Sequence, residues 1–166
     1  MIIVTVGTSS TPFDRLVRAA GTLETGEDVI VQHGASSERP RATRCVAALP
    51  GDELAALMQT ARVVVTHCGV GSILGAISAG RTPVVVPRLA ALGEAVDDHQ
   101  LELARRLAEL GLVTVVEDVA ELPDAIAAAV DRGSGRVGTR LVQELASYLI
   151  QCVGRAPAAD ASATGA

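Results

Sequence analysis

Short β-branched segments alternate with amphipathic segments along most of the chain. The candidate strands, which are rich in valine and isoleucine, are residues 2–6, 28–32, 62–66, 83–86 and 112–116, with 46–49 a weaker candidate. Between them leucine, valine and alanine recur at helical spacing. Because strands that alternate with helices form βαβ units, we expect a Rossmann-like α/β fold, with a parallel sheet and helices on both of its faces.

Capping residues and glycines predict where the helices begin and end. Thr11 is the predicted N-cap of the first helix, with Pro12 at its first position and Gly21 at its end. Asp52 is predicted to cap the second helix. Further helices are predicted after the turn at 67–72 as far as Gly80, over 98–110, from 118 onward and over 139–153. The longest predicted loop is 88–97.

The length of 166 residues fits a single domain, which we assign to residues 1–153. Residues 154–166 are mostly alanine, glycine and serine, have little to bury, and are expected to be disordered. Ligands of parallel α/β sheets bind beyond the carboxyl ends of the strands, so the site is expected at that rim.

Composition removes several classes of function. The chain has one Phe, one Tyr and no Trp, and its net charge is −5. Base stacking and a broad basic surface are therefore lacking, and no nucleic-acid partner is expected. All 14 basic residues are arginines. The absence of lysine excludes Schiff-base chemistry and the Walker-type phosphate loop.

The cysteines and the first residues indicate the cellular compartment. The 3 cysteines are widely spaced and form no C-x-x-C pattern, so neither a disulfide framework nor a zinc site is predicted. The first residues lack the basic start of a signal peptide, and no apolar run approaches the roughly 20 residues of a membrane span. A cytoplasmic, reducing location is expected.

Two glycine-containing turns lie between a predicted strand and a predicted helix, at Gly7-Thr8-Ser9-Ser10 and Gly69-Val70-Gly71-Ser72. Glycine lets a backbone approach a phosphate, and the N–H groups and dipole of a helix N-terminus favour an anion. The competing interpretation is that each glycine serves only the geometry of its turn. Two such turns in one domain favour phosphate.

A dinucleotide site is the obvious rival, and the sequence argues against it. The second turn has the spacing Gly69-x-Gly71-x-x-x-Gly75 rather than G-x-G-x-x-G. The next strand ends in Val86-Pro87-Arg88, with no acidic residue to bind a ribose.

The histidines fall near predicted strand ends or a helix start. His67 adjoins the second glycine turn, so a contact with phosphate is favoured over a buried structural role. His99 and Gln100 begin a helix and suit sugar hydroxyls, while Asp97 and Asp98 are more typical of helix caps. The spacing of His33, His67, His99 and Cys68 matches no common metal site, and no metal is expected.

These motifs together resemble a known family. In chain order they are Val4-Thr5-Val6-Gly7-Thr8, Phe13-Asp14-Arg15-Leu16, Gln32-x-Gly34, His67-x-Gly69-x-Gly71-Ser72, Pro87-Arg88 and Gly93-Glu94-x-Val96-x-Asp98-His99-Gln100-Leu101. Over residues 1–116 they resemble the catalytic subunits of split glycosyltransferases of family 28, of the Alg13 and PssE types. The resemblance implies the C-terminal, donor-binding lobe of a GT-B enzyme.

The resemblance also implies the site and the partners. The residues implied to bind the donor diphosphate are Gly7, Thr8, Ser9, His67, Gly69, Gly71 and Ser72. Those implied to contact the transferred sugar are His99, Gln100 and, more weakly, Glu94. A membrane-anchored partner subunit would supply the acceptor-binding lobe, bind the lipid-linked acceptor and hold the complex at the cytoplasmic face. No cofactor is implied beyond the UDP-sugar substrate.

One position departs from the pattern of the family. Three residues after the serine of the second turn the relatives usually carry a Glu that binds the ribose hydroxyls, and here the ribose region has Gly75. The leading hypothesis is transfer of a sugar from a UDP-sugar to a lipid-linked saccharide, in exopolysaccharide or cell-surface glycan synthesis, with no catalytic base assigned to this chain. A non-catalytic nucleotide-sugar-binding or scaffold subunit is the alternative. A nucleotide-sugar epimerase is disfavoured because one lobe cannot enclose its substrate.

Overall fold

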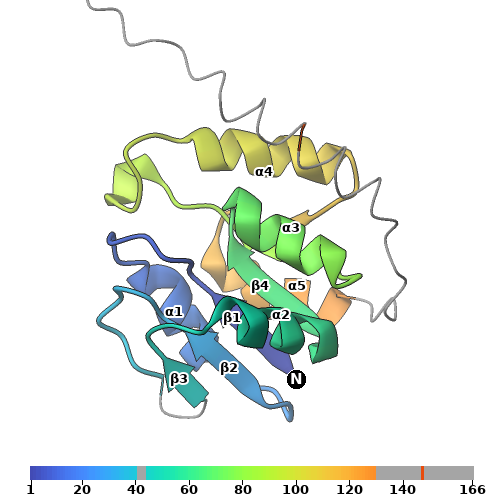
Figure 1. Cartoon of the computed structure of the whole chain (residues 1–166). Coiled ribbons are helices and arrows are strands. Elements are labelled where there is room, and N and C mark those ends of the chain that lie inside the picture. The colour runs from blue at the N-terminus through green and yellow to red at the C-terminus, as the bar shows by residue number, and fades with distance from the viewer. Residues whose placement is uncertain (41–43, 130–146, 148–166) are drawn as a thin grey trace, which may run out of the picture.

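The computed structural model describes residues 1–40, 44–129 and 147, and its centre is one parallel sheet (Figure 1). The strands are β1 (Ile2–Thr5), β2 (Val29–Gln32), β3 (Arg44–Val46), β4 (Val63–His67), β5 (Val84–Val86) and β6 (Thr114–Val115). Their order in the sheet is β3-β2-β1-β4-β5-β6. The order therefore reverses between β1 and β4, and the carboxyl ends of these two strands form the switch point where such folds bind ligands.

Helices cover both faces of the sheet. The α-helices are α1 (Asp14–Gly21), α2 (Gly51–Thr60), α3 (Val70–Ser78), α4 (His99–Glu109) and α5 (Leu122–Ala128), with 3₁₀ turns η1 (Ala90–Leu92) and η2 (Val119–Glu121). Helices α1 and α5 pack on one face, whereas α2, α3 and α4 pack on the other. The fold class expected from the sequence is confirmed.

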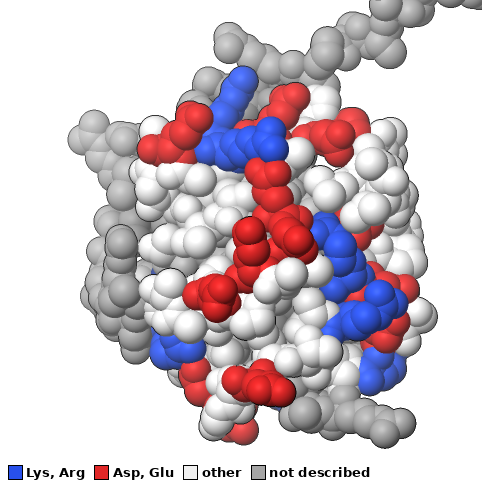
Figure 2. Space-filling view, turned by 180° about the vertical axis from the view of Figure 1, so that it is seen from behind, with Lys and Arg blue, Asp and Glu red and all other residues white. Residues whose placement is uncertain are grey.

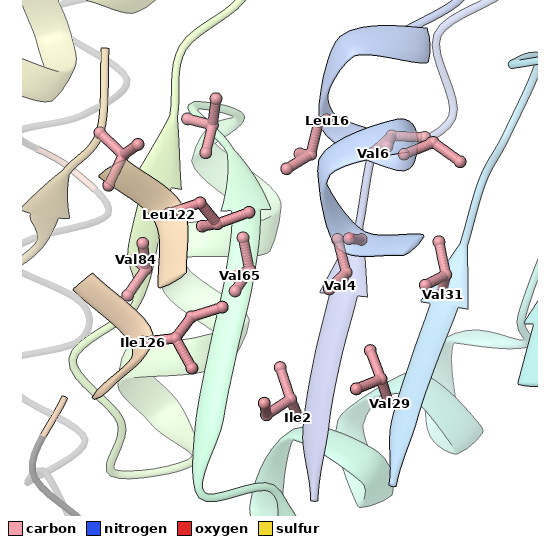
Figure 3. Packing of buried hydrophobic residues seen from close by; sticks show 14 of the residues in the cluster. Ile2, Val4, Val6, Leu16, Val29, Val31, Val65, Val84, Leu122 and Ile126 are labelled. Carbon is pink, nitrogen blue, oxygen red and sulfur yellow. The ribbon is translucent and has the colours of Figure 1, made fainter. Parts of the chain in front are cut away.

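Alternation along the strands supplies both halves of the core. Ile2, Val4 and Val65 point toward α1 and α5, where Leu16 and Ile126 meet them (Figure 3). Their neighbours along the strands point to the opposite face, where the buried residues include Ile3, Val64, Val85, Met58, Ile73 and Leu107. Burying each of these aliphatic side chains contributes about 1.5–3 kcal/mol of transfer free energy. Small β-branched residues can therefore form the core.

The boundaries of some elements differ from the predictions. The predicted N-cap at Thr11 is wrong, because α1 begins at Asp14 with Phe13 at its N-cap. The predicted cap at Asp52 is also wrong, since Pro50 precedes α2 and Asp52 lies in the first turn. The weak strand candidate at 46–49 lies earlier, at Arg44–Val46. The predicted helix from Asp118 is divided into η2 and α5.

Two expectations fall beyond the part of the chain that the structure describes. The predicted helix over 139–153 lies outside it except for Ser147, and so does the predicted tail at 154–166. Among the described residues, no helix is long and apolar enough to cross a membrane. The same residues contain no group of three metal-ligating side chains. On the face turned to the viewer in Figure 2, acidic side chains and arginines lie next to one another.

Glu27 binds two positive groups at the end of the sheet opposite the carboxyl ends of the strands. Arg62, just before β4, donates from Nε to Glu27 Oε1 at 2.9 Å, and the amino group of Met1 donates to Glu27 Oε2 at 2.8 Å. The hydrogen bond from Arg62, followed by that from Met1, lowers the pKa of Glu27 from 4.5 to about 2.

We therefore expect Glu27→Gln to lower the free energy of unfolding at neutral pH by about 1–2 kcal/mol. This is less than the full pKa shift implies, because the two side chains remain 28% and 30% exposed. A depressed carboxylate pKa stabilises the fold above pH 4.5, and this contribution is lost as the pH falls toward about 2. Urea unfolding from neutral to acidic pH should show the free energies of unfolding of wild type and Glu27→Gln converging.

The control is Glu38→Gln, which removes the pair of Glu38 with Arg18, where the side chains are 36% and 65% exposed. It should leave the free energy of unfolding close to that of the wild type at every pH, because an exposed ion pair contributes little. A constant difference between wild type and Glu27→Gln at every pH would contradict the assignment.

Candidate functional site

Two cavities open at the carboxyl ends of the strands. The first, of about 270 Å³, is lined by Thr5, Gly7, Thr8, Gln32, Ala48, Leu49, Leu54, His67, Gly69, Gly71 and Ser72. The second, of about 260 Å³, lies between α3 and α4 and is lined by Cys68, Gly69, Val70, His99, Gln100, Glu102, Leu103 and Arg106. Gly69 lines both, so the two cavities adjoin at the beginning of α3. We call them the β1–β4 cavity and the α3–α4 cavity.

The imidazole of His67 lies between the two glycine turns. A Cβ atom added to Gly7 would overlap Cε1 of His67, and one added to Gly69 would overlap Nε2. Gly7 also has a φ of 77°, in the left-handed region. Gly69 has an ordinary φ of −92°, so the ring alone requires glycine there. The two turns identified in the sequence are thus both built around one histidine.

His67 is neutral at physiological pH. Burial, together with the nearby positive charge of Arg88, lowers the pKa of His67 from 6.5 to about 4, although a hydrogen bond with the Thr5 backbone acts in the opposite direction. A neutral imidazole offers one donor and one acceptor. Because the Thr5 backbone already engages the ring, His67 brings an uncharged imidazole with one ring nitrogen left for the β1–β4 cavity, and its contact with phosphate remains a prediction.

Gln32 forms the floor of the β1–β4 cavity and was not selected as a site residue from the sequence. Its Nε2 donates to the carbonyls of Gly7 and Ala47 at 3.0 and 2.9 Å, and its Oε1 accepts from Thr5 Oγ1 at 2.6 Å. Both ends of the amide are satisfied within the protein, so Gln32 fixes the Gly7 turn rather than offering a group to a ligand. The available signal was its place in the Gln32-x-Gly34 motif.

The N-terminus of α3 faces the β1–β4 cavity without a side-chain cap. The first helical hydrogen bond runs from Ile73 N to Gly69 O at 3.0 Å, so the N–H groups before it have no intrahelical acceptor. A Cβ on Gly71 would meet no atom within 4 Å. The helix end thus combines available donors, a favourable dipole and open space, which suits an anion.

Gly75 lies in contact with α2. A Cβ at this position would come within 3.3 Å of Sδ of Met58, and Gly75 is absent from the described lining of either cavity. Glycine here lets α2 and α3 approach closely. That the ribose of a donor would lie near this position remains a prediction.

Polar groups at the mouth of the α3–α4 cavity are oriented by the backbone. The backbone N–H of Arg88 donates to Gln100 Oε1 at 3.2 Å, and His99 Nδ1 lies 3.0 Å from Asp97 Oδ1. Cys68 is buried, and burial raises the pKa of its thiol to about 12. Cys68 is therefore a poor nucleophile.

Glu94 is engaged within the loop that precedes α4. Its Oε1 and Oε2 accept from Arg15 at 3.0 and 2.9 Å, and Oε2 also accepts from the backbone N–H of Leu89 at 3.1 Å. Both carboxylate oxygens are thus used by the protein, and Glu94 lines neither cavity. The predicted sugar contact of Glu94 is untested, and its contacts here position the loop.

The structure brings most of the predicted site residues to two adjoining places. Those that line the β1–β4 cavity are Gly7, Thr8, His67, Gly69, Gly71 and Ser72, and those at the α3–α4 cavity are Gly69, His99 and Gln100. Ser9, Gly75 and Glu94 line neither cavity. Ser9 instead accepts from Thr11 N at 3.1 Å. His33 is buried at 4% exposure and also lies outside both linings.

Comparison with known proteins supplies the family. Residues 1–134 match the family described as the glycosyltransferase family 28 C-terminal domain. A segment of 56 residues is 41% identical to the UDP-N-acetylglucosamine transferase subunit ALG13 of Yarrowia lipolytica (strain CLIB 122 / E 150). That segment covers 34% of this chain and 26% of the relative, so the match spans about a quarter of the relative's length.

Solved structures share the fold at low identity. CalG4, the calicheamicin glycosyltransferase, superimposes with a TM-score of 0.59 at 19% identity. The glycosyltransferase SnogD from Streptomyces nogalater gives a TM-score of 0.57 at 20% identity. Each match covers 93% of this chain and 39% of the other. The chain therefore has the fold of one lobe of such enzymes, and the expected C-terminal lobe of a GT-B glycosyltransferase is confirmed as a fold class.

The overlap between His67 and a Cβ atom at Gly69 can be tested by a double-mutant cycle. Gly69→Ala should lower the free energy of unfolding by about 1–3 kcal/mol, because the new methyl group must displace the imidazole. In a His67→Ala background the same change should cost less than about 1 kcal/mol, the remaining difference between Gly and Ala at an N-cap. Urea unfolding of the four proteins measures the coupling. An equal cost in both backgrounds would show that the ring does not determine this glycine.

Proposed function

Because the chain belongs to the glycosyltransferase family 28 C-terminal domain family, we propose that it is the donor-binding catalytic subunit of a two-component glycosyltransferase. In this proposal it transfers a sugar from a UDP-sugar to a lipid-linked saccharide, in the synthesis of exopolysaccharide or a cell-surface glycan. The partner subunit supplies the acceptor-binding lobe. It is anchored in the membrane and holds this chain at the cytoplasmic face.

The observation that carries the proposal is the uncapped N-terminus of α3 opening into the β1–β4 cavity. Gly71 leaves space beside the helix end, and Ser72 adds a hydroxyl. His67 adds an uncharged imidazole whose position is fixed by the glycines on either side. We assign the diphosphate of the donor to this end of the cavity, with Thr8 from the facing turn.

The remainder of the donor follows from this placement. Ala48, Leu49 and Leu54 form an apolar wall of the same cavity and suit a nucleobase. The α3–α4 cavity adjoins at Gly69, which places His99 and Gln100 next to the diphosphate, where the transferred sugar would be attached.

The chemistry assigned to this lobe is stabilisation of the leaving group. As the bond from the sugar to the diphosphate breaks, negative charge grows on the diphosphate, and preorganised N–H groups at a helix N-terminus stabilise it. We assign no cofactor and no metal to this step, and we name no catalytic base. The base that takes the proton of the acceptor hydroxyl belongs, in this proposal, to the partner subunit.

Two findings support a partner. The described residues have the fold of one lobe, and the match covers 39% of the length of two glycosyltransferase chains of similar fold. The relative in Yarrowia lipolytica is named as a subunit.

A second candidate is a non-catalytic subunit that binds the nucleotide-sugar or only supports the partner. Gly75 favours it, because this position contacts Met58 and supplies no carboxylate for a ribose.

The α3 terminus is tested by Gly71→Val. A β-branched side chain would fill the space beside the N–H groups, and we expect at least a tenfold loss of UDP affinity by calorimetry, about 1.4 kcal/mol or more. The fold should tolerate the change because no atom lies within 4 Å of the added Cβ.

The matched control is Gly51→Val, in the first turn of α2, where the added Cβ also meets nothing within 4 Å but the residue lines neither cavity. It should bind UDP like the wild type. Wild-type UDP affinity in a folded Gly71→Val protein would remove the diphosphate from this helix end.

The two-component model is tested by activity with and without the partner. The chain alone should bind UDP yet transfer little sugar, because the acceptor site is on the other subunit. Co-expression with a membrane-anchored partner should restore transfer from a UDP-sugar to a lipid-diphosphate saccharide, measured with radiolabelled donor. Robust transfer by this chain alone would contradict the model, and UDP binding without transfer in the assembled complex would favour the non-catalytic alternative.

A further inference from the structure

The side chain of Asp97 folds back over the beginning of α4. Its Oδ1 lies 3.0 Å from Nδ1 of His99 and also accepts a hydrogen bond from the backbone N–H of His99 at 3.2 Å. One carboxylate oxygen thus contacts the same residue at two points. The sequence had indicated only a helix cap for this aspartate, and the cap accounts for only one of the two contacts.

The contact with the ring determines which nitrogen of His99 carries the proton. A carboxylate accepts hydrogen bonds and does not donate them, so Nδ1 must be protonated to bond Asp97. In a neutral imidazole the other nitrogen, Nε2, is then an acceptor. His99 lines the α3–α4 cavity, and Nε2 is the ring nitrogen that Asp97 leaves for it.

The side-chain amide of Gln100 is oriented to offer a donor, whereas His99 offers an acceptor. The backbone N–H of Arg88 can only donate, and it donates to Oε1 of Gln100 at 3.2 Å. The NH₂ group of Gln100 is therefore the end that remains for a ligand. Within the described residues, His99 and Gln100 thus bring one acceptor and one donor to the lining of the α3–α4 cavity, which also includes Glu102 and Arg106.

We propose that Asp97 is a positioning residue that fixes His99 as an acceptor, so that His99 and Gln100 together read hydroxyl groups of a neutral sugar. A hydroxyl group both donates and accepts, so one hydroxyl or an adjacent pair satisfies both side chains. A carboxylate in the same place could accept from Gln100 but would face the lone pair of Nε2. The pair itself therefore favours a neutral hexosyl donor over a uronic acid donor, whose carboxylate could find a positive partner only in Arg106 among the described residues of this lining. This inference rests on the proposed function.

The tautomer of His99 is measured first, because it does not depend on any ligand. The imidazole ¹⁵N resonances distinguish protonated from bare nitrogens, and the chain has only 3 histidines. The His99→Gln spectrum assigns the signals of His99. At about pH 8.5, where histidine is neutral, His99 should carry its proton on Nδ1. Asp97→Ala should move the proton toward Nε2, whereas Asp97→Asn keeps an acceptor oxygen and should leave it on Nδ1.

The matched control is Asp118→Ala. Asp118 accepts from the backbone N–H two residues later, at 2.9 Å from Ala120, just as Asp97 accepts from His99. It is exposed and lines neither of the two cavities, so its loss should reproduce any general effect of removing a cap without changing the spectrum of His99.

Binding is then measured by calorimetry with UDP, UDP-glucose, UDP-N-acetylglucosamine and UDP-glucuronic acid. Asp97→Ala should weaken the better-bound neutral UDP-sugar about fivefold, the value of one hydrogen bond, and leave UDP within about twofold. Asp97→Asn and Asp118→Ala should match the wild type. UDP-glucuronic acid should bind the wild type more weakly than UDP-glucose.

The outcomes separate this inference from the proposed function. A wild-type protein that carries the proton on Nε2 of His99 overturns the inference, as does an Asp97→Ala protein that binds the neutral UDP-sugars like the wild type. Equal or tighter binding of UDP-glucuronic acid overturns the selection for a neutral sugar, and so do neutral UDP-sugars that bind the wild type no better than UDP. If neither UDP nor any UDP-sugar binds, the proposed function is overturned, and with it the recognition of a sugar by His99 and Gln100. The ¹⁵N spectra still decide whether Asp97 fixes the tautomer of His99.

Discussion

The buried guanidinium of Arg88 joins the parts of the molecule that form the site. It is 2% exposed and donates to the carbonyls of Val6, Thr11, Pro12 and Glu94, while its Cζ lies 4.6 Å from the ring centroid of Phe13. A buried charge is costly unless polar groups surround it. Four carbonyl dipoles and an aromatic face surround this one, although its Nε has no hydrogen-bond partner among the described residues. Because the acceptors belong to the β1–α1 turn and the loop before α4, these two segments cannot move independently.

The electrostatics of the site follow from the same residue. The positive charge of Arg88 adds to burial in lowering the pKa of His67, so the histidine between the glycine turns stays neutral. The backbone N–H of Arg88 orients Gln100 at the other cavity. Arg88 lines neither cavity, yet its charge helps to keep His67 neutral. Its backbone N–H also determines which end of the Gln100 amide is left for a ligand. Arg88 stands two residues after the end of β5, within reach of both segments.

The sequence predicted the strands and the site rim better than the helix starts, for a physical reason. Valine and isoleucine runs are a local signal, because a buried parallel strand needs little else. The start of α1 is not local: the Thr11 and Pro12 carbonyls accept from Arg88, 77 and 76 residues away, and Phe13 N donates to Ser36 Oγ. Tertiary contacts therefore replaced the Thr11 cap that local sequence favoured. The pairing of Asp97 with His99 likewise depends on a side-chain conformation that spacing alone does not reveal.

Glycine has a different structural role at each of three positions near the site. Gly69 makes room for His67, Gly71 leaves open space at a helix end, and Gly75 allows Met58 to pack close to α3. At the position where the family resemblance predicts a ribose-binding Glu, the presence of Gly75 is thus coupled to the methionine opposite it. A carboxylate side chain there would bring a Cβ within 3.3 Å of Sδ of Met58 and require that flexible side chain to shift. Close packing of α2 on α3 is therefore a reason for glycine at this position, which cannot be interpreted from the ligand site alone.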